Sequence, residues 1–143
     1  MSYDLRDHTA DVAVEARATS LDDVFGAVAD GMAAAMCDEI PETGGERFEL
    51  TVTAEGRQAL LFDYLDELIY ERDVRVVLPV DNEVSVSTPS ADGDGTGEWR
   101  LSGSARGVPL ASVEARDLKA VTYSEMDISE TDDGWHAYVV FDV

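Results

Sequence analysis

The side chains best suited to chemistry lie at the two ends of the sequence. Asp7, His8 and Asp11 fall within five residues near its start, and Asp142 directly precedes Val143 at its end. The carboxylate of Asp142 and the terminal carboxylate repel each other unless a cation or a hydrogen-bond donor pairs with them. Oxygen donors of this kind bind hard cations such as calcium and magnesium. The spacing of the first group, taken alone, favours a turn bonded by its own side chains.

A single lysine stands out among the basic residues. Lys119 is the only one, against nine arginines. Its compact ammonium group suits a phosphate or a carboxylate cluster, and an ordinary exposed charge on a strand explains it equally well. The sequence has no P-loop, no nucleophile elbow and no His-Glu-x-x-His motif. Two histidines and one cysteine, Cys37, exclude a multi-histidine zinc site, a cysteine cluster and an internal disulfide.

The net charge restricts the partners of this protein. Thirty-one acidic residues against ten basic ones give a formal charge of −21. Such a surface repels itself at low ionic strength and is relieved by salt, so the composition is typical of a cytoplasmic protein from a high-salt organism. Phosphate backbones need clustered Lys and Arg, so we expect no direct nucleic-acid binding. No apolar run approaches the ~20 residues that cross a bilayer, and we expect no membrane partner.

Positioning these residues requires an ordered set of helices and strands. Alternation predicts strands at Val12–Arg17 and Phe48–Thr53, and apolar faces predict helices at Leu21–Cys37 and Arg57–Arg72. Later strands are expected at Val74–Val80, Val84–Thr88, Trp99–Ser104, Leu118–Ile128 and Trp135–Val143, with hairpin turns at Asp81–Asn82 and Asp133–Gly134. Asp92–Glu98 resembles the start of an EF-hand loop, but Gly103 stands where a bidentate Glu is required. We therefore expect Ser90–Gly97 to be an exposed loop.

The order of these elements predicts the fold class. It favours a single α+β domain over residues 1–143, in which two helices pack as one layer on a largely antiparallel or mixed sheet. If the last strand runs antiparallel beside Val12–Arg17, its end meets the start of the other. Asp11 then joins Asp142 and the terminal carboxylate, and three oxygen donors suit calcium or magnesium.

Five segments in order resemble the archease family over essentially the whole chain. They are Asp7-His-Thr-Ala-Asp11, Ser20-Leu-Asp-Asp-Val-Phe25, Leu60-Leu-Phe-Asp-Tyr-Leu-Asp-Glu-Leu-Ile-Tyr70, Lys119-Ala-Val-Thr-Tyr123 and Phe141-Asp-Val143. Tyr64, Asp66 and Ser124 depart from residues common in the family. The resemblance implies an α+β fold that holds calcium through Asp11, Asp142 and Val143, with Asp7 and His8 around the ion and Lys119 as a further functional residue.

The resemblance also implies a function. Archeases are accessory proteins of tRNA splicing that activate the RtcB-type RNA ligase, promote its guanylylation and turnover, and broaden its nucleotide use. We therefore expect a protein cofactor of that ligase rather than an enzyme. The alternatives are a general chaperone-like modifier of RNA-processing enzymes and a metal-dependent phosphohydrolase with His8 as its base. Magnesium and manganese are alternatives to calcium.

Overall fold

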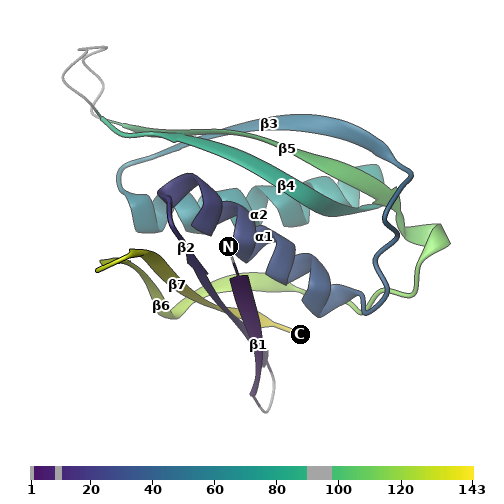
Figure 1. Ribbon diagram of the computed structural model, residues 1–143. Helices are drawn as coiled ribbons and strands as arrows, with labels where there is room; N and C mark the ends of the chain where they lie inside the picture. Colours follow the sequence, from purple (N-terminus) through teal and green to yellow (C-terminus); the bar gives the residue numbers. More distant parts are fainter. Residues whose placement is uncertain (1, 9–10, 90–97) are drawn as a thin grey trace.

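Two helices lie between two antiparallel sheets in the computed structural model, which describes residues 2–8, 11–89 and 98–143 (Figure 1). One sheet has four strands in the order β1-β2-β7-β6, and the other has three in the order β3-β5-β4. The strands are β1 Ser2–His8, β2 Asp11–Ala18, β3 Glu46–Ala54, β4 Val77–Ser87, β5 Trp99–Pro109, β6 Ala120–Thr131 and β7 Gly134–Asp142. The helices are α1 Leu21–Met36 and α2 Arg57–Arg75, and a short 3-10 turn covers Leu110–Ser112.

A side-chain cap begins α1, and a left-handed residue follows α2. The Ser20 side chain caps α1 by accepting a hydrogen bond of 3.1 Å from the Asp23 N–H. The Asp22 carboxylate, in the first turn of α1, accepts the Val86 N–H at 2.8 Å and so ties the helix to β4. α2 ends at Arg75, and the next residue, Val76, adopts a left-handed conformation with φ of 56°.

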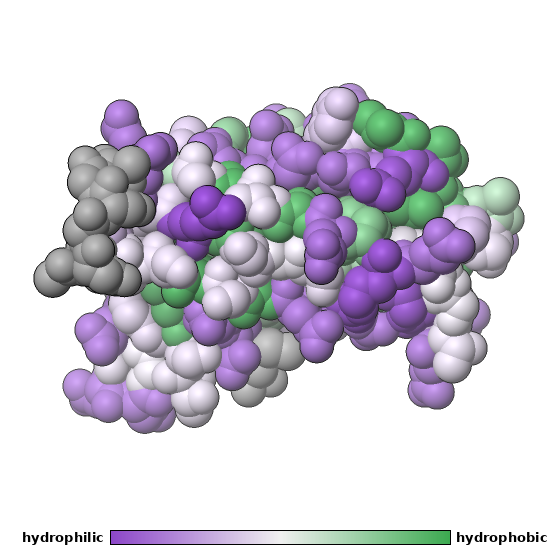
Figure 2. Space-filling view, turned by 90° about the horizontal axis from the view of Figure 1, so that it is seen from above, coloured by the Kyte–Doolittle hydropathy of each residue, from purple (hydrophilic) through white to green (hydrophobic). Residues whose placement is uncertain are grey.

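Each sheet turns one face to the helices. In the four-stranded sheet the inward positions of β2 and β7 include Val14, Val139 and Phe141, none of which has any exposed surface. The three-stranded sheet carries polar residues on most of its other face, which Figure 2 shows from above. This alternation is the expected pattern of antiparallel sheets that are covered on one side. No helix within the described ranges is long and apolar enough to span a bilayer.

The α+β class, the two helices and the antiparallel pairing are confirmed. The two-layer arrangement needs correction, because the strands form two sheets and the helices pack against both. Alternation identifies strands but does not say which strands pair, so it could not divide them between sheets. The hairpin that joins β6 to β7 beside Asp133–Gly134 is confirmed. Ser90–Gly97 lies outside the described residues.

Two local predictions were wrong, and one strand was missed. The first strand, β1, was not predicted, because its residues are mostly polar or charged. Val74 belongs to α2 instead of the following strand. Asp81–Asn82 is a bulge within one continuous strand, β4, rather than a hairpin turn.

Remote residues explain the bulge in β4. The Asp30 carboxylate of α1 accepts hydrogen bonds from the Asn82 main-chain and side-chain nitrogens at 3.0 and 2.9 Å. Asp81 has a φ of 49°, and its carboxylate bonds the Arg106 side chain at 2.7 Å. The polar pair is therefore held inside the strand by contacts that a local turn would not have.

Candidate functional site

Pairing of the strands aligns three of the predicted site residues, His8, Asp11 and Asp142, in one row across the edge of the four-stranded sheet. The register places Asp11 of β2 opposite Asp142 of β7. On one side of this pair Asp142 faces Ala120 of β6, and on the other Asp11 faces His8 of β1. The expected antiparallel meeting of the first and last predicted strands is confirmed. Cross-strand partners of an antiparallel pair place their side chains on the same face, so the two carboxylates share one face of the sheet.

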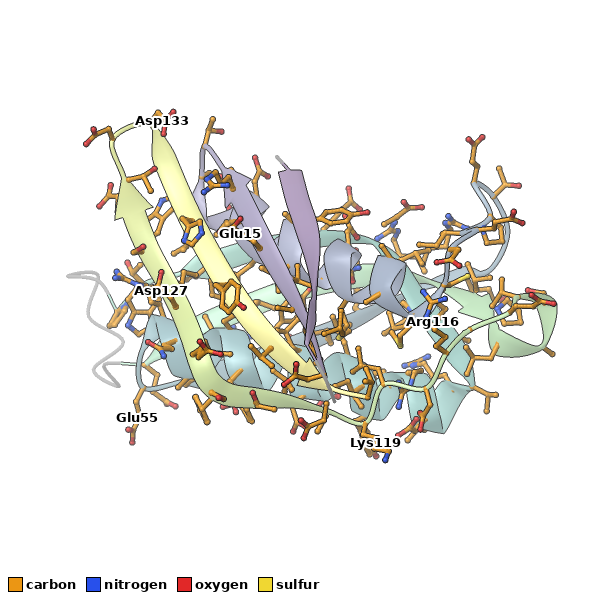
Figure 3. All side chains as sticks on the ribbon, turned by 90° about the horizontal axis from the view of Figure 1, so that it is seen from below. Glu15, Glu55, Arg116, Lys119, Asp127 and Asp133 are labelled. Atoms are coloured by element: carbon orange, nitrogen blue, oxygen red, sulfur yellow. The ribbon has the colours of Figure 1, made fainter. Side chains whose placement is uncertain are left out.

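Lys119 lies beside this row. Its main-chain N–H donates a hydrogen bond of 2.8 Å to the Asp142 carbonyl oxygen, immediately before β6 begins. Its side chain is exposed, and Figure 3 shows it projecting from the edge of the molecule. The lysine ammonium is thus presented to the outside next to the end of β7.

A buried arginine holds this segment in place. Arg72 of α2 donates hydrogen bonds to the Leu118 carbonyl at 2.8 Å and to the Met36 sulfur at 3.3 Å. It also pairs with Asp73 at 3.0 Å. The arginine side chain is only 8% exposed, so its charge is satisfied almost wholly within the protein. Sequence reasoning missed Arg72 because its charge favours an exposed position, although its spacing from Leu65 and Leu68 places it on the buried face of the helix.

The donors at the row suit a hard cation. Asp11 is half-buried and Asp142 is exposed, and like charges directly opposite each other in a sheet destabilise it. Across the described ranges, no group of three His, Cys, Asp or Glu side chains is placed to hold a metal. A cation between Asp11 and Asp142 would therefore draw its remaining oxygens from Val143, from water or from a partner. Calcium accepts such mixed oxygen ligands more readily than magnesium, which demands a near-octahedral set.

The other residues singled out from the sequence lie at different distances from this row. His8 stands in the row by its register, whereas Asp7 stands opposite Val12, one position along β1. Thr9 and Ala10 lie outside the described residues, so the predicted side-chain-bonded turn stays a prediction. Cys37 is buried at the end of α1, as expected of a small hydrophobic residue.

A second polar cluster lies further along the same face of the sheet. His136 Nε2 is 2.9 Å from a Glu15 oxygen, and His136 Nδ1 is 3.5 Å from an Asp127 oxygen. Figure 3 shows Glu15 and Asp127 on neighbouring parts of this face. Ser129 lies directly across from His136, but its hydroxyl donates at 3.1 Å to the same Asp127 oxygen that faces His136 Nδ1. The hydroxyl thus bonds the carboxylate instead of the imidazole, and the described residues of this cluster show no serine–histidine hydrogen bond for nucleophilic catalysis. Only the alternation of β2 and β7 pointed to this cluster in the sequence.

A cavity of about 630 Å³ lies in another part of the molecule, between the end of α1 and the segment before Asp117. Arg116 lines it, bonds the Ala35 carbonyl at 3.0 Å and pairs with Asp38 at 2.9 Å. The neighbouring guanidinium lowers the pKa of the Asp38 carboxyl. Its lining includes none of the residues predicted for chemistry.

Comparison with known proteins identifies the family. The model of the Archease protein family matches residues 3–143. Archeases of Archaeoglobus fulgidus and Methanosarcina barkeri are 33% and 31% identical to the chain, covering 100% and 99% of it and 100% and 95% of their own lengths. The solution structure of a Methanobacterium thermoautotrophicum protein has a TM-score of 0.82 at 28% identity, and covers 99% of this chain and 98% of its own.

A second solved structure shares the fold. It is an archease of Thermotoga maritima, named a possible chaperone, with a TM-score of 0.62 at 20% identity and coverage of 96% of this chain and 94% of its own. The agreement of the family model, the relatives and the fold extends over nearly the whole chain. The chain therefore belongs to the archease family.

Proposed function

We propose that this archease activates an RtcB-type RNA ligase by presenting the edge formed by Asp11, Asp142, Val143 and Lys119 to the ligase. The observation that carries the proposal is the register that sets Asp11 opposite Asp142, with Lys119 bonded to the Asp142 main chain. Two opposed carboxylates and an exposed ammonium at one edge are groups that bind ions and charged partners. The activity proposed is promotion of ligase guanylylation and turnover, with broader nucleotide use.

The roles divide by chemistry. Asp11, Asp142 and Val143 supply oxygens to calcium, with Asp7 and His8 around the ion. Lys119 contacts a nucleotide phosphate or a ligase carboxylate. When bound, the ion supplies positive charge at an edge that otherwise carries two facing carboxylates. The chain itself acts as a protein cofactor and leaves the covalent chemistry and the RNA to the ligase.

Electrostatics support a protein partner. A protein of net charge −21 is matched to the basic surface that an RNA-binding ligase needs. The same charge is unsuited to RNA. We propose a cytoplasmic location at high salt, where long-range steering is weak and contact at the edge must supply the affinity.

The deciding experiment measures guanylylation of the ligase with GTP, with and without this protein, at high salt. Wild type is expected to accelerate guanylylation, and Asp142→Ala and Lys119→Ala are expected to lose the effect. Asp132→Ala, at the opposite end of the β6–β7 hairpin, and Arg100→Ala, on β5, are matched controls for the two charges. No stimulation by wild type refutes the function, whereas equal stimulation by the site variants and the controls refutes the site.

A general chaperone-like modifier is the second candidate, favoured by the name given to the Thermotoga maritima protein. A pull-down from cells distinguishes the two, because the ligase dominates the captured proteins in one case and many RNA-processing enzymes appear in the other. Nucleotide hydrolysis by the isolated protein, lost in Asp11→Ala, would instead support a phosphohydrolase. A calorimetric titration with calcium, magnesium and manganese identifies the ion.

A further inference from the structure

The two sheets leave one side of helix α2 exposed. β6 is an edge strand of the four-stranded sheet, β3 is an edge strand of the three-stranded sheet, and α2 packs against both. Asp63, Asp66 and Tyr70 follow one another at helical spacings of three and four on α2, so they lie on one stripe. We call this stripe, together with Phe62 and Tyr123, the α2 flank.

The α2 flank carries aromatic surface in a fixed geometry. The Tyr123 ring of β6 stacks on the Phe62 ring of α2 with centroids 4.0 Å apart and planes at 3°. Tyr123 is 54% exposed and Tyr70 is 58% exposed, both large values for aromatic residues. One face of the Tyr123 ring is covered by Phe62, so the exposed surface of the stack is free for a ligand.

The shape of β6 explains why Tyr123 is held there. The register shifts between Thr122 and Asp127, and Glu125 adopts a left-handed φ of 59°. The Gln58 side chain of α2 donates a hydrogen bond of 3.1 Å to the Met126 carbonyl within this bulge. Bulges re-aim side chains at the edges of sheets. This one is anchored to the helix that completes the flank.

The carboxylates of the α2 flank favour a positively charged partner. Partial burial, with the nearby Asp66 carboxylate, raises the pKa of Asp63. A positive group beside these acids would relieve their repulsion. Elsewhere in the chain, guanidinium groups lie over aromatic rings: Arg75 is 4.5 Å from the Phe48 centroid and Arg57 is 5.2 Å from the Trp135 centroid. Among the described residues, no such contact covers Tyr70 or Tyr123.

We propose that the α2 flank is a docking surface for an arginine-bearing segment of a protein partner. A guanidinium group stacks on aromatic faces and bonds carboxylates through two parallel donors, so one side chain satisfies both features of the flank. The occupant is a protein, because a chain of net charge −21 repels nucleic acids and anionic membranes. The helix that carries the flank also contacts the segment that contains Lys119, since Arg72 of α2 bonds the Leu118 carbonyl. The proposal rests on the proposed function only in taking the ligase as the second partner to test.

The first test uses a short capped peptide in which arginine and glycine alternate, and the matching lysine peptide, in constant high salt. Chemical shifts of the isotope-labelled protein are followed during titration. We expect saturable shifts in residues 62–70 and 123, and about tenfold weaker binding for Tyr70→Ala with Tyr123→Ala. Tyr70→Phe with Tyr123→Phe should retain binding, because the rings remain. Shifts spread evenly over the acidic surface, or equal affinity for both peptides, overturn the proposal.

A charge reversal supplies a matched control. Asp66→Lys and Asp132→Lys change the net charge equally, but only the first lies on the flank. Asp66→Lys is expected to weaken binding of the arginine peptide several-fold more than Asp132→Lys. Equal effects of the two variants would show that the peptide is held only by non-specific electrostatic attraction, and would overturn the proposal. The same variants are then compared for affinity to the RtcB-type ligase. If wild type binds the peptide at the flank but not the ligase, the proposed function fails and the docking surface stands.

Discussion

Replacing Asp142 by Asn should change the stability of the protein in opposite directions with and without calcium. Directly opposed residues of an antiparallel pair hold their Cβ atoms about 5 Å apart. At that distance, with the dielectric constant of bulk water, ~80, two carboxylates repel each other by about 1 kcal/mol. The register places Asp11 and Asp142 in this arrangement. Without a cation, Asp142→Asn should therefore raise the free energy of unfolding by about 1 kcal/mol.

Calcium should reverse the order of stability of wild type and Asp142→Asn. An ion present at a hundred times its dissociation constant stabilises the folded state by about 2.7 kcal/mol. Wild type should gain this amount and the variant should gain little, so wild type becomes the more stable by about 2 kcal/mol. The assay is urea unfolding, followed by the fluorescence of Trp99 and Trp135, in chelator and in calcium at constant ionic strength.

The control for this experiment is Asp132→Asn, at the far end of the β6–β7 hairpin, which should respond to calcium as wild type does. Equal stabilisation of Asp142→Asn and wild type by calcium would show that Asp142 does not bind the ion. A variant that is less stable than wild type in chelator would show that the facing carboxylates do not repel each other as the register implies.

Three further predictions concern other parts of the molecule. Arg72→Met should lower the free energy of unfolding by about 3 kcal/mol, because it leaves the buried Leu118 carbonyl without its charged donor; urea unfolding should show a much smaller loss for the more exposed Arg75→Met. Transfer from high to low potassium chloride should lower the melting temperature, since 31 acidic residues face only ten basic ones; an unchanged melting temperature would contradict this. Burial and the neighbouring Glu71 and Asp66 raise the pKa of Glu67 in the folded state, so its ionisation opposes folding as pH rises. Glu67→Gln should therefore be more stable than wild type at pH 7 and lose that advantage below the ordinary value of 4.5, and a gain that persists in acid would exclude charge as the cause.

The sequence predicted the helices and the meeting of the chain ends because both depend on local patterns. Val12–Arg17 and Trp135–Val143 alternate cleanly, and each ends in or adjoins an aspartate, so antiparallel pairing alone aligns Asp11 with Asp142. The family resemblance added a functional role for Lys119, which the composition had already singled out as the only lysine. Which metal binds there depends on ligands that strand pairing does not define, so calcium remains a proposal.

The features that were not predicted depend on contacts between distant residues. Asp30 and Arg106 convert Asp81–Asn82 from a turn into a bulge, and no local pattern contains them. The His136–Glu15 contact and the Tyr123–Phe62 stack likewise join residues from separate elements. β1 was missed because a polar edge strand lacks the hydrophobic alternation of a half-buried one.

The pairing of β2 with β7 also affects how the protein folds. Asp11 and Asp142 are separated by almost the whole sequence, and contacts of such high sequence separation form slowly because a long loop must close first. During synthesis, the residues of β2 leave the ribosome long before those of β7 are made. The row of carboxylates therefore cannot form until β7 has been synthesised. A cation that binds both aspartates would therefore stabilise only the completed protein and slow its unfolding, and the amides of β2 and β7 would become protected from hydrogen exchange together.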